Sequence, residues 1–251
     1  MPRTILITGA SSGIGLACAE IFATFGDRLI LCGRNSERLN AIAQRLSCQT
    51  QVDTLLFDVR DRRQVVSAFD SLGELKNDID ILINNAGNAH GLDPVDSGDA
   101  QDWDAMLDGN VKGLLYVSQQ VIPALKSKKK GHIVNISSVA ARQTYSGGVV
   151  YCASKRAVDV LSEGMRLELT EHGIKVTNIQ PGAVKTDFSN VRFKGDTARA
   201  DAVYQGYEPL LPQDVADAIS YCVNAPDHVT ISDLTIYPKA QSEPRTLFRN
   251  M

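Results

Sequence analysis

The chain has 251 residues, 43% of them hydrophobic and 22% charged, and its formal net charge is −3. Such a chain can bury a full hydrophobic core and lacks the high charge and low hydrophobicity of a disordered protein. The weakly acidic balance excludes a general electrostatic attraction to nucleic acid or to an anionic membrane, so we expect neither as a partner.

The cysteines follow no pattern of metal ligands or disulfide pairs, since there is no C-x-x-C and no histidine stands at ligand spacing. We therefore expect reduced thiols, no metal site and a reducing, cytoplasmic environment. The apolar runs are no longer than strands, and the first one ends in glycine, so we expect neither a membrane span nor a signal peptide. The cysteines are Cys18, Cys32, Cys48, Cys152 and Cys222.

Short apolar runs alternate with longer amphipathic stretches along the whole chain. The apolar runs, rich in Val, Ile and Leu, predict strands at 4–8, 28–33, 51–57, 80–84, 132–137, 175–180 and 234–238. Apolar residues at helical spacing predict helices near 13–25, 36–46, 61–72, 99–126, 150–171 and 212–224. This alternation predicts an α/β fold over 1–251: a single-domain, Rossmann-type, doubly wound parallel sheet of about seven strands with helices on both faces.

The turn between the first strand and the first helix is TGASSGIG, Thr8 to Gly15. Its glycines remove side chains where a pyrophosphate must approach the backbone and where the helix packs on the strand. The helix N-terminus offers free N–H groups and a partial positive charge to the phosphates. Glycines also make ordinary turns, but a strand-to-helix junction favours a dinucleotide site. We expect the cofactor to contact Gly9, Ser11, Ser12, Gly13, Ile14 and Gly15.

The end of the second strand indicates which dinucleotide binds. NAD-specific sites carry an acidic residue there, which accepts hydrogen bonds from the adenosine ribose. This chain has Gly33 at that place, followed by Arg34 and Asn35. The missing carboxylate removes repulsion against a 2′-phosphate, and a guanidinium can bind that phosphate through paired hydrogen bonds. We therefore predict NADP(H), contacted by Arg34 and Asn35; Arg38 could assist or could be a solvated helix residue.

Tyr151 and Lys155 stand four residues apart in YCASK, on a predicted helix. They could be two surface residues that share a face, or the lysine could change how the tyrosine handles its proton. A free tyrosine has a pKa of about 10, and a cation one helical turn away stabilises the phenolate and lowers that pKa. Ser138, which ends the fifth strand, could hydrogen-bond a developing alkoxide. Its neighbour Ser137 should point to the opposite side of the strand, and Cys152 should be a small core residue.

Together these motifs resemble the short-chain dehydrogenase/reductase family. TGASSGIG, NNAG (84–87), Asn110, Ser138, YCASK and PGAVKT (181–186) stand in the family's order, and the resemblance covers essentially the whole chain. It implies an enzyme that moves hydride between a nicotinamide and a carbonyl or alcohol, with Tyr151 as general acid/base and Ser138 holding the substrate oxygen. It also implies that Lys155 holds the nicotinamide ribose and that Asn110 supports a water-linked proton relay. Asn110 could instead bridge backbone groups in a kinked helix.

The resemblance implies further cofactor contacts and a quaternary structure. The contacts lie at the adenine edge (Asp58, Val59), along the adenosine ribose and pyrophosphate (Asn85, Ala86, Gly87) and at the nicotinamide carboxamide (Pro181, Gly182, Val184, Thr186). Family members usually assemble through their long helices, which implies a homotetramer or homodimer. Some proteins of this fold bind the dinucleotide without catalysis, but such members tend to lose the Tyr or the Lys, and both are present here.

Within the family the chain is most similar to NADP-dependent 3-hydroxy acid dehydrogenases, which oxidise serine, L-allo-threonine and related small acids. GRNSERL (33–39), NAGNAHGLDP (85–94), FSNVRFKGD (188–196) and LPQDVADAI (211–219) carry this similarity. Reduction of an unrelated ketone or aldehyde with NADPH is the alternative function.

The polar stretch 186–205 breaks the strand–helix alternation and follows a strand end, so it is either a substrate lid or a long surface connection. A substrate carboxylate would need a cation nearby. Arg192 is our candidate, with Lys194 and Arg142 as alternatives, although each of them could equally be a solvated surface residue; His90 stands beside the expected pocket.

Overall fold

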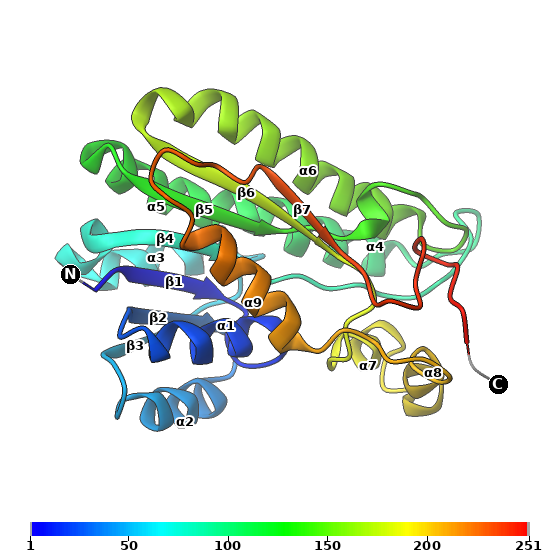
Figure 1. Ribbon diagram of the computed structural model, residues 1–251. Helices are drawn as coiled ribbons and strands as arrows, with labels where there is room; N and C mark the ends of the chain where they lie inside the picture. Colours follow the sequence, from blue (N-terminus) through cyan, green and yellow to red (C-terminus); the bar gives the residue numbers. More distant parts are fainter. Residues whose placement is uncertain (1, 250–251) are drawn as a thin grey trace.

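Residues 2–249 are described by the computed structural model, and they contain one seven-stranded sheet in the order β3-β2-β1-β4-β5-β6-β7. All neighbouring strands are parallel, and the order reverses between β1 and β4 (Figure 1). The strands are β1 Thr4–Thr8, β2 Arg28–Gly33, β3 Val52–Leu56, β4 Ile79–Asn84, β5 Gly131–Ile136, β6 Ile174–Pro181 and β7 Asp233–Ile236. The predicted Rossmann-type, doubly wound fold is confirmed.

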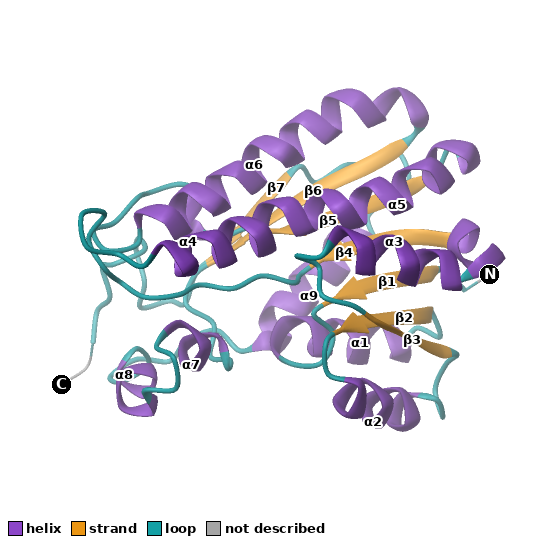
Figure 2. Cartoon of the chain, turned by 180° about the vertical axis from the view of Figure 1, so that it is seen from behind, coloured by secondary structure: helices purple, strands orange, loops and turns teal. Residues whose placement is uncertain are grey.

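Helices cover both faces of the sheet (Figure 2). One face carries α1 Gly13–Thr24, α2 Ser36–Leu46 and α9 Pro212–Val223, and the other carries α3 Arg62–Ser71, α5 Gly113–Lys128 and α6 Val149–Leu169. In β1, Ile5 and Ile7 point into the first core and Leu6 into the second, and all three are fully buried. Burial on both faces explains the continuous apolar strands, since each such side chain contributes roughly 1.5–3 kcal/mol.

The segment predicted as one helix at 99–126 is interrupted. Helix α4, Ala100–Leu107, passes into a π-helical turn, Asp108–Lys112, before α5 begins at Gly113. A Cβ at Gly113 would lie 2.9 Å from the Cβ of Val59, so the chain passes very close to the segment after β3 at this point. The widened turn places Asn110 in the interior, where it is 2% exposed.

The stretch 186–205 contains two short helices, α7 Phe188–Arg192 and α8 Thr197–Ala202. They lie beyond the end of the sheet toward which the strands point, to the right in Figure 1. Ligands of open α/β sheets bind at this end.

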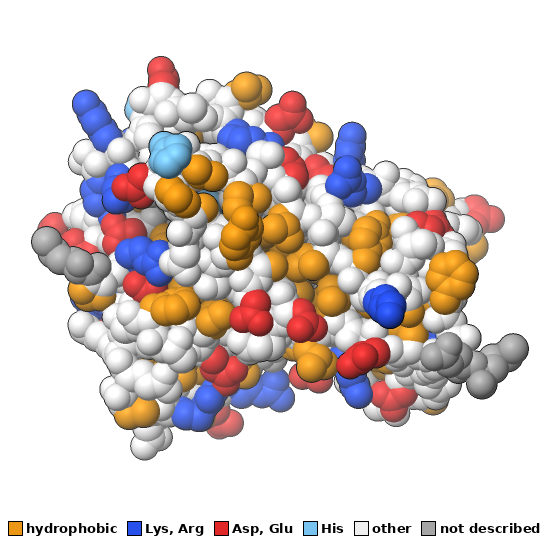
Figure 3. Space-filling model, viewed as in Figure 1, with side chains coloured by type: hydrophobic (Ala, Val, Ile, Leu, Met, Phe, Trp, Pro, Cys, Tyr) orange, Lys and Arg blue, Asp and Glu red, His pale blue; other side chains and the backbone are white. Residues whose placement is uncertain are grey.

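On the face shown in Figure 3, positive and negative side chains are mixed around a central band of apolar ones. This mixture agrees with the small net charge of −3. Within residues 2–249, no helix combines the length and apolar character needed to cross a membrane.

Candidate active site

A cavity of about 330 Å³ lies at the carboxyl ends of the strands, where the strand order reverses. It brings together most of the residues that the sequence singles out: Gly9, Ser11, Ser12, Gly13, Ile14, Arg34, Asp58, Val59, Asn85, Ala86, Gly87, Ser138, Tyr151, Lys155, Pro181, Gly182, Val184 and Thr186. Four predicted residues, Gly15, Asn35, Asn110 and Arg192, do not line it. The contacts that these four residues make outside the cavity are described below.

Two glycines of the first turn have different roles. Gly9 has a φ of +66°, and a Cβ there would meet the Asn85 side chain at 2.9 Å. Gly15 is buried beneath the turn, and a Cβ there would overlap the carbonyl oxygen of Gly9. Gly15 therefore permits close packing of the helix on the turn, whereas Gly9 adopts the left-handed conformation and lets the turn approach Asn85 closely.

The N-terminus of α1 faces the cavity with its donors unused by side chains. Its N-cap residue, Ser12, makes no side-chain hydrogen bond to the helix, and the first turn holds no acidic residue. The free N–H groups and the helix dipole point into the space lined by Ser11 and Gly13. This arrangement fits a pyrophosphate group.

Three charged residues, Arg34, Asp58 and Arg60, line the cavity where β2 and β3 end. Arg34 is 69% exposed, and its Nη1 lies 3.6 Å from Oδ2 of Asp58. Arg60, which the sequence motifs do not single out, donates to that carboxylate from Nη2 at 2.6 Å and from Nε at 3.0 Å. Burial raises the pKa of Asp58, but the hydrogen bonds and charge of Arg60, with a further contribution from Arg34, lower it overall.

Asn35 serves the helix that follows it. Its side chain caps α2 by accepting a hydrogen bond from the backbone N–H of Arg38 at 2.9 Å. The cap fixes where α2 begins, directly after Arg34.

Tyr151 and Lys155 lie one turn apart on α6, and both side chains are buried. Lys155 donates from Nζ to the carbonyl oxygen of Ile136 at 2.9 Å. Burial lowers the pKa of Lys155 to about 8, against an opposing attraction to Asp159. Burial raises the pKa of the Tyr151 phenol, and nearby Tyr145 adds to this. The predicted lowering of the Tyr151 pKa is not found in this structure, because desolvation outweighs the groups that lower it.

Ser138 and Ser137 point to opposite sides of the chain, as strand alternation predicts. Ser138 accepts a hydrogen bond from the backbone N–H of Ala140 at 3.1 Å, and its bond to Tyr151 counteracts part of the rise in the phenol pKa. Ser137 donates to Asp159 at 2.6 Å and is buried against α6. Both serines line the cavity, but only the Ser138 hydroxyl bonds to Tyr151, whereas that of Ser137 is engaged with Asp159.

Asn110 uses both ends of its side chain inside the protein. Its Oδ1 accepts from the backbone N–H of Asn88 at 2.8 Å, and its Nδ2 donates to the Asn88 carbonyl and to Ser154, both at 2.9 Å. A Cβ on Gly87 would lie 2.9 Å from Asn110 Oδ1 and 3.3 Å from Lys155 Nζ, so the three meet closely. The Asn110 side chain thus bridges the backbone N–H and carbonyl of Asn88, which is the bridging role given above as the alternative to a proton relay.

Arg192 lies over the Tyr151 ring, although it does not line the main cavity. Its guanidinium carbon is 5.3 Å from the ring centroid, and its Nη2 donates to the hydroxyl of Tyr145 at 2.8 Å. Phe188, also on α7, meets the Tyr151 ring edge-on with the centroids 5.8 Å apart. The segment after β6 thus covers Tyr151 with one cation and one aromatic ring.

The other candidate cations are engaged elsewhere. Lys194 forms an ion pair with Asp102 at 2.9 Å, which ties the α7–α8 turn to α4. Arg142 donates to Thr235 at 2.8 Å, on the far side of β6 from the cavity residues, and does not line the cavity. Arg245, near the end of the chain, was not expected; its guanidinium carbon lies 5.4 Å from the centroid of the Tyr145 ring.

His90 and Cys152 lie beside the site without entering the main cavity. His90 borders a small adjoining hollow together with Tyr151 and Trp103. Burial lowers the pKa of His90, with Asp102 opposing the change. Cys152 packs in the apolar cluster around Tyr151, as expected of a small core residue.

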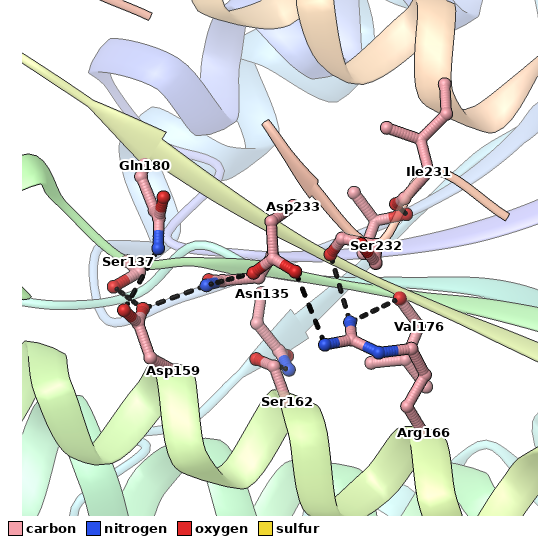
Figure 4. A network of polar contacts seen from close by, with 12 residues as sticks. Asn135, Ser137, Asp159, Ser162, Arg166, Val176, Gln180, Ile231, Ser232 and Asp233 are labelled. Atoms are coloured by element: carbon pink, nitrogen blue, oxygen red, sulfur yellow. Dashed lines mark hydrogen bonds and ion pairs between the residues drawn. The ribbon is translucent and has the colours of Figure 1, made fainter. Parts of the chain in front are cut away.

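A polar network holds α6 on the sheet (Figure 4). Asp159, one turn after Lys155, accepts hydrogen bonds from Ser137 at 2.6 Å, Asn178 at 2.8 Å and Gln180 at 2.9 Å. Arg166, two turns further along, donates to the carbonyl oxygens of Val176 and Ser232. These bonds fix the rotation of α6 and therefore the direction of Tyr151 and Lys155.

The model of the family described as short chain dehydrogenase matches residues 3–196. The chain belongs to this family.

Two curated relatives match over nearly the whole chain. The chain is 42% identical over 243 residues to "Sulfoacetaldehyde reductase 2" of Chromohalobacter salexigens. This alignment covers 96% of this chain and 96% of the relative. It is 39% identical over 250 residues to "NADP-dependent 3-hydroxy acid dehydrogenase" of Schizosaccharomyces pombe, covering 98% of this chain and 96% of the relative.

A solved structure is also similar to this protein over nearly the whole chain. It is "The Closed form of serine dehydrogenase complexed with NADP+", with a TM-score of 0.92 and 38% identity over 99% of this chain and 100% of that one. The similarity therefore includes the region around 186–205.

Proposed function

We propose that this short-chain dehydrogenase is an NADP(H)-dependent oxidoreductase that interconverts a small 3-hydroxy acid, such as serine or L-allo-threonine, with its 3-oxo product. When bound, the nicotinamide supplies or accepts the hydride. The protein's own side chains hold the reacting oxygen, move its proton and bind the substrate's negative charge.

Tyr151 is the proposed general acid/base. The phenol is protonated at neutral pH, and burial raises its pKa further; the protonated form is the one that donates a proton to a carbonyl oxygen during reduction. Ser138, beside it, is positioned to hydrogen-bond the same oxygen. Lys155 lines the cavity with its Nζ fixed on Ile136, so it can hold ribose hydroxyls. We assign Asn110, which bridges Asn88 and Ser154 close to Lys155, to support of a water-linked proton relay.

Two observations favour NADP(H) over NAD(H). The end of β2 has Gly33 in place of an acid, and the guanidinium of Arg34 is mostly exposed at the cavity edge. The names of the dehydrogenase relative and of the structural neighbour both include NADP. We assign the cofactor contacts to the cavity-lining residues given above, with Gly15 and Asn35 acting through the turn and the cap.

The substrate class rests on one observation: the Arg192 guanidinium lies over Tyr151, 5.3 Å from its ring centroid. A compound whose hydroxyl reaches Tyr151 therefore has a cation within reach of a carboxylate two carbons away. Within the described residues, Arg192 donates to Tyr145 and Gly91, which leaves further N–H groups of its fork for a ligand.

Arg192→Ala tests this assignment. We expect the KM for L-serine or 3-hydroxyisobutyrate to rise about tenfold or more, because a charged hydrogen bond is lost, while a neutral secondary alcohol is affected much less. Arg199→Ala, in the same 186–205 segment, is the matched control. Equal losses with acidic and neutral substrates would remove the carboxylate hypothesis.

A second candidate reaction is reduction of a short aldehyde that carries a sulfonate. It is favoured by the 42% identity to a protein named sulfoacetaldehyde reductase. A sulfonate presents oxygens to Arg192 much as a carboxylate does. A panel of 3-hydroxy acids and sulfoacetaldehyde, followed through NADPH absorbance, separates the two reactions.

We further propose that 186–205 is the substrate lid of the single catalytic domain, since α7 covers Tyr151 and Lys194 ties the segment to Asp102.

We propose a homodimer or homotetramer, with no nucleic acid or membrane partner. The five unpaired thiols, four of them buried, fit a reducing, cytoplasmic environment.

A further inference from the structure

We propose that Arg60 is a specificity-determining residue for NADP(H), acting through Asp58: it occupies the Asp58 carboxylate and so leaves Arg34 free to bind a 2′-phosphate. This inference rests on the proposed cofactor. Arg60 belongs to none of the motifs that carry the family resemblance, and its part in the site follows only from its contacts.

The contacts of Asp58 are divided unequally between the two arginines. Arg60 donates to both carboxylate oxygens, from Nη2 and Nε to Oδ2 at 2.6 and 3.0 Å and from Nε to Oδ1 at 3.1 Å. Its backbone N–H adds a bond to Oδ1 at 3.0 Å. Arg34 approaches Oδ2 only to 3.6 Å, too far for a good hydrogen bond. Asp58 is thus held by Arg60 and only weakly by Arg34.

The exposure of the three side chains follows the same division. Arg34 is 69% exposed, Arg60 40% and Asp58 18%. All three line the same end of the cavity. Arg34 is therefore the group that extends into the open space beside Gly33, where the missing acid leaves room for a phosphate.

Without Arg60 this end of the cavity would lose its net positive charge. Arg34, Arg60 and Asp58 together carry a charge of +1, and removing Arg60 would leave the Arg34–Asp58 pair neutral. The freed carboxylate would then compete with a phosphate for Arg34, which already lies 3.6 Å away. It would also repel a 2′-phosphate directly. NAD(H) lacks that phosphate, so its binding should change little.

The test measures binding and does not depend on turnover. Dissociation constants for NADPH and NADH are measured by cofactor fluorescence for the wild type, Arg60→Ala, Arg34→Ala, Asp58→Asn/Arg60→Ala and Arg34→Ala/Arg60→Ala. Arg62→Ala is the matched control, since Arg62 is an exposed arginine two residues away that does not line the cavity. Thermal unfolding of each variant checks that it is folded.

We expect Arg60→Ala to weaken NADPH binding about tenfold or more and NADH binding less than about threefold. Removing the carboxylate as well, in Asp58→Asn/Arg60→Ala, should restore most of the ratio of NADPH affinity to NADH affinity, because loss of an adenine contact of Asp58 would weaken both cofactors alike. In the Arg34→Ala background, removing Arg60 should add little.

Three results would overturn the proposal: equal weakening of both cofactors, no recovery in Asp58→Asn/Arg60→Ala, or fully additive losses from Arg34 and Arg60. Failure of the proposed cofactor would be recognised separately, because the wild type itself would then bind NADH as tightly as NADPH.

Discussion

Tyr151 and Lys155 line the cavity but are only 8% and 5% exposed. Desolvation favours the neutral form of each group, so it raises the pKa of the phenol and lowers that of the ammonium to about 8. At neutral pH the pair is therefore a protonated phenol beside a charged lysine. That state is ready to donate a proton, whereas oxidation of an alcohol first requires the phenol to lose one.

The two reaction directions should consequently differ in pH dependence. We expect kcat/KM for carbonyl reduction to fall as the pH rises above about 8, where Lys155 loses its charge, and oxidation to have the more alkaline optimum. Profiles of both directions measured between pH 6 and 10 would check this; coincident profiles would contradict it.

Tyr151→Phe should abolish turnover in both directions while NADPH binding stays largely intact.

Gly33 offers a second residue-scale prediction. A Cβ there would meet only side-chain carbons of Leu39, at 3.5 Å and beyond, which is ordinary contact. Packing therefore does not require glycine, and Gly33→Asp should fold. We expect this variant to bind NADPH at least about tenfold more weakly, through repulsion of the 2′-phosphate, and to gain affinity for NADH. An unchanged ratio of the two dissociation constants would show that this position does not select the cofactor.

At the scale of elements, α6 carries the catalytic pair and must hold it in one orientation. Its apolar side faces the second core, but apolar contacts alone permit small rotations and slides. The three donors to Asp159 and the two carbonyl bonds of Arg166 are directional, so they fix the helix against β5 and β6.

Loss of the Asp159 charge should therefore destabilise the protein. In Asp159→Asn an amide N–H₂ would face donors from Ser137, Asn178 or Gln180, and we expect the free energy of unfolding to fall by about 2 kcal/mol or more. Urea unfolding at fixed protein concentration measures this. The control is Glu163→Gln, on an exposed position of the same helix, which should change the stability by less than about 0.5 kcal/mol. Similar effects of the two substitutions would show that the network adds no stability.

At the scale of the whole molecule, α5 and α6 lie side by side over one face of the sheet (Figure 2). Their outer surfaces leave large apolar side chains in solvent: Leu115 is 38%, Val160 57% and Leu167 79% exposed. Exposed apolar side chains on two long neighbouring helices are candidates for burial in a protein interface. We assign the proposed assembly of subunits to this face.

Light scattering after size exclusion should accordingly give the mass of a dimer or tetramer. Combining Val160→Glu with Leu167→Glu should shift the mass toward a monomer, because a carboxylate cannot be buried there without a partner. Tyr221→Glu, which replaces a 67% exposed side chain on α9, is the control and should leave the mass unchanged. A monomeric wild type would contradict the assignment.

The sequence by itself determined the layered fold and the cofactor cavity. Alternating apolar runs and amphipathic stretches are local patterns, and the glycine turn, Gly33 and Arg34, Ser138 and YCASK each act through local backbone geometry. Only the tertiary structure decided what depends on contacts between distant segments: the π-helical turn at Asn110, the pKa of Tyr151, Arg192 over its ring, and the approach of Arg34 to within 3.6 Å of Asp58. Burial and long-range hydrogen bonding set these features, and neither is encoded in the spacing of neighbouring residues.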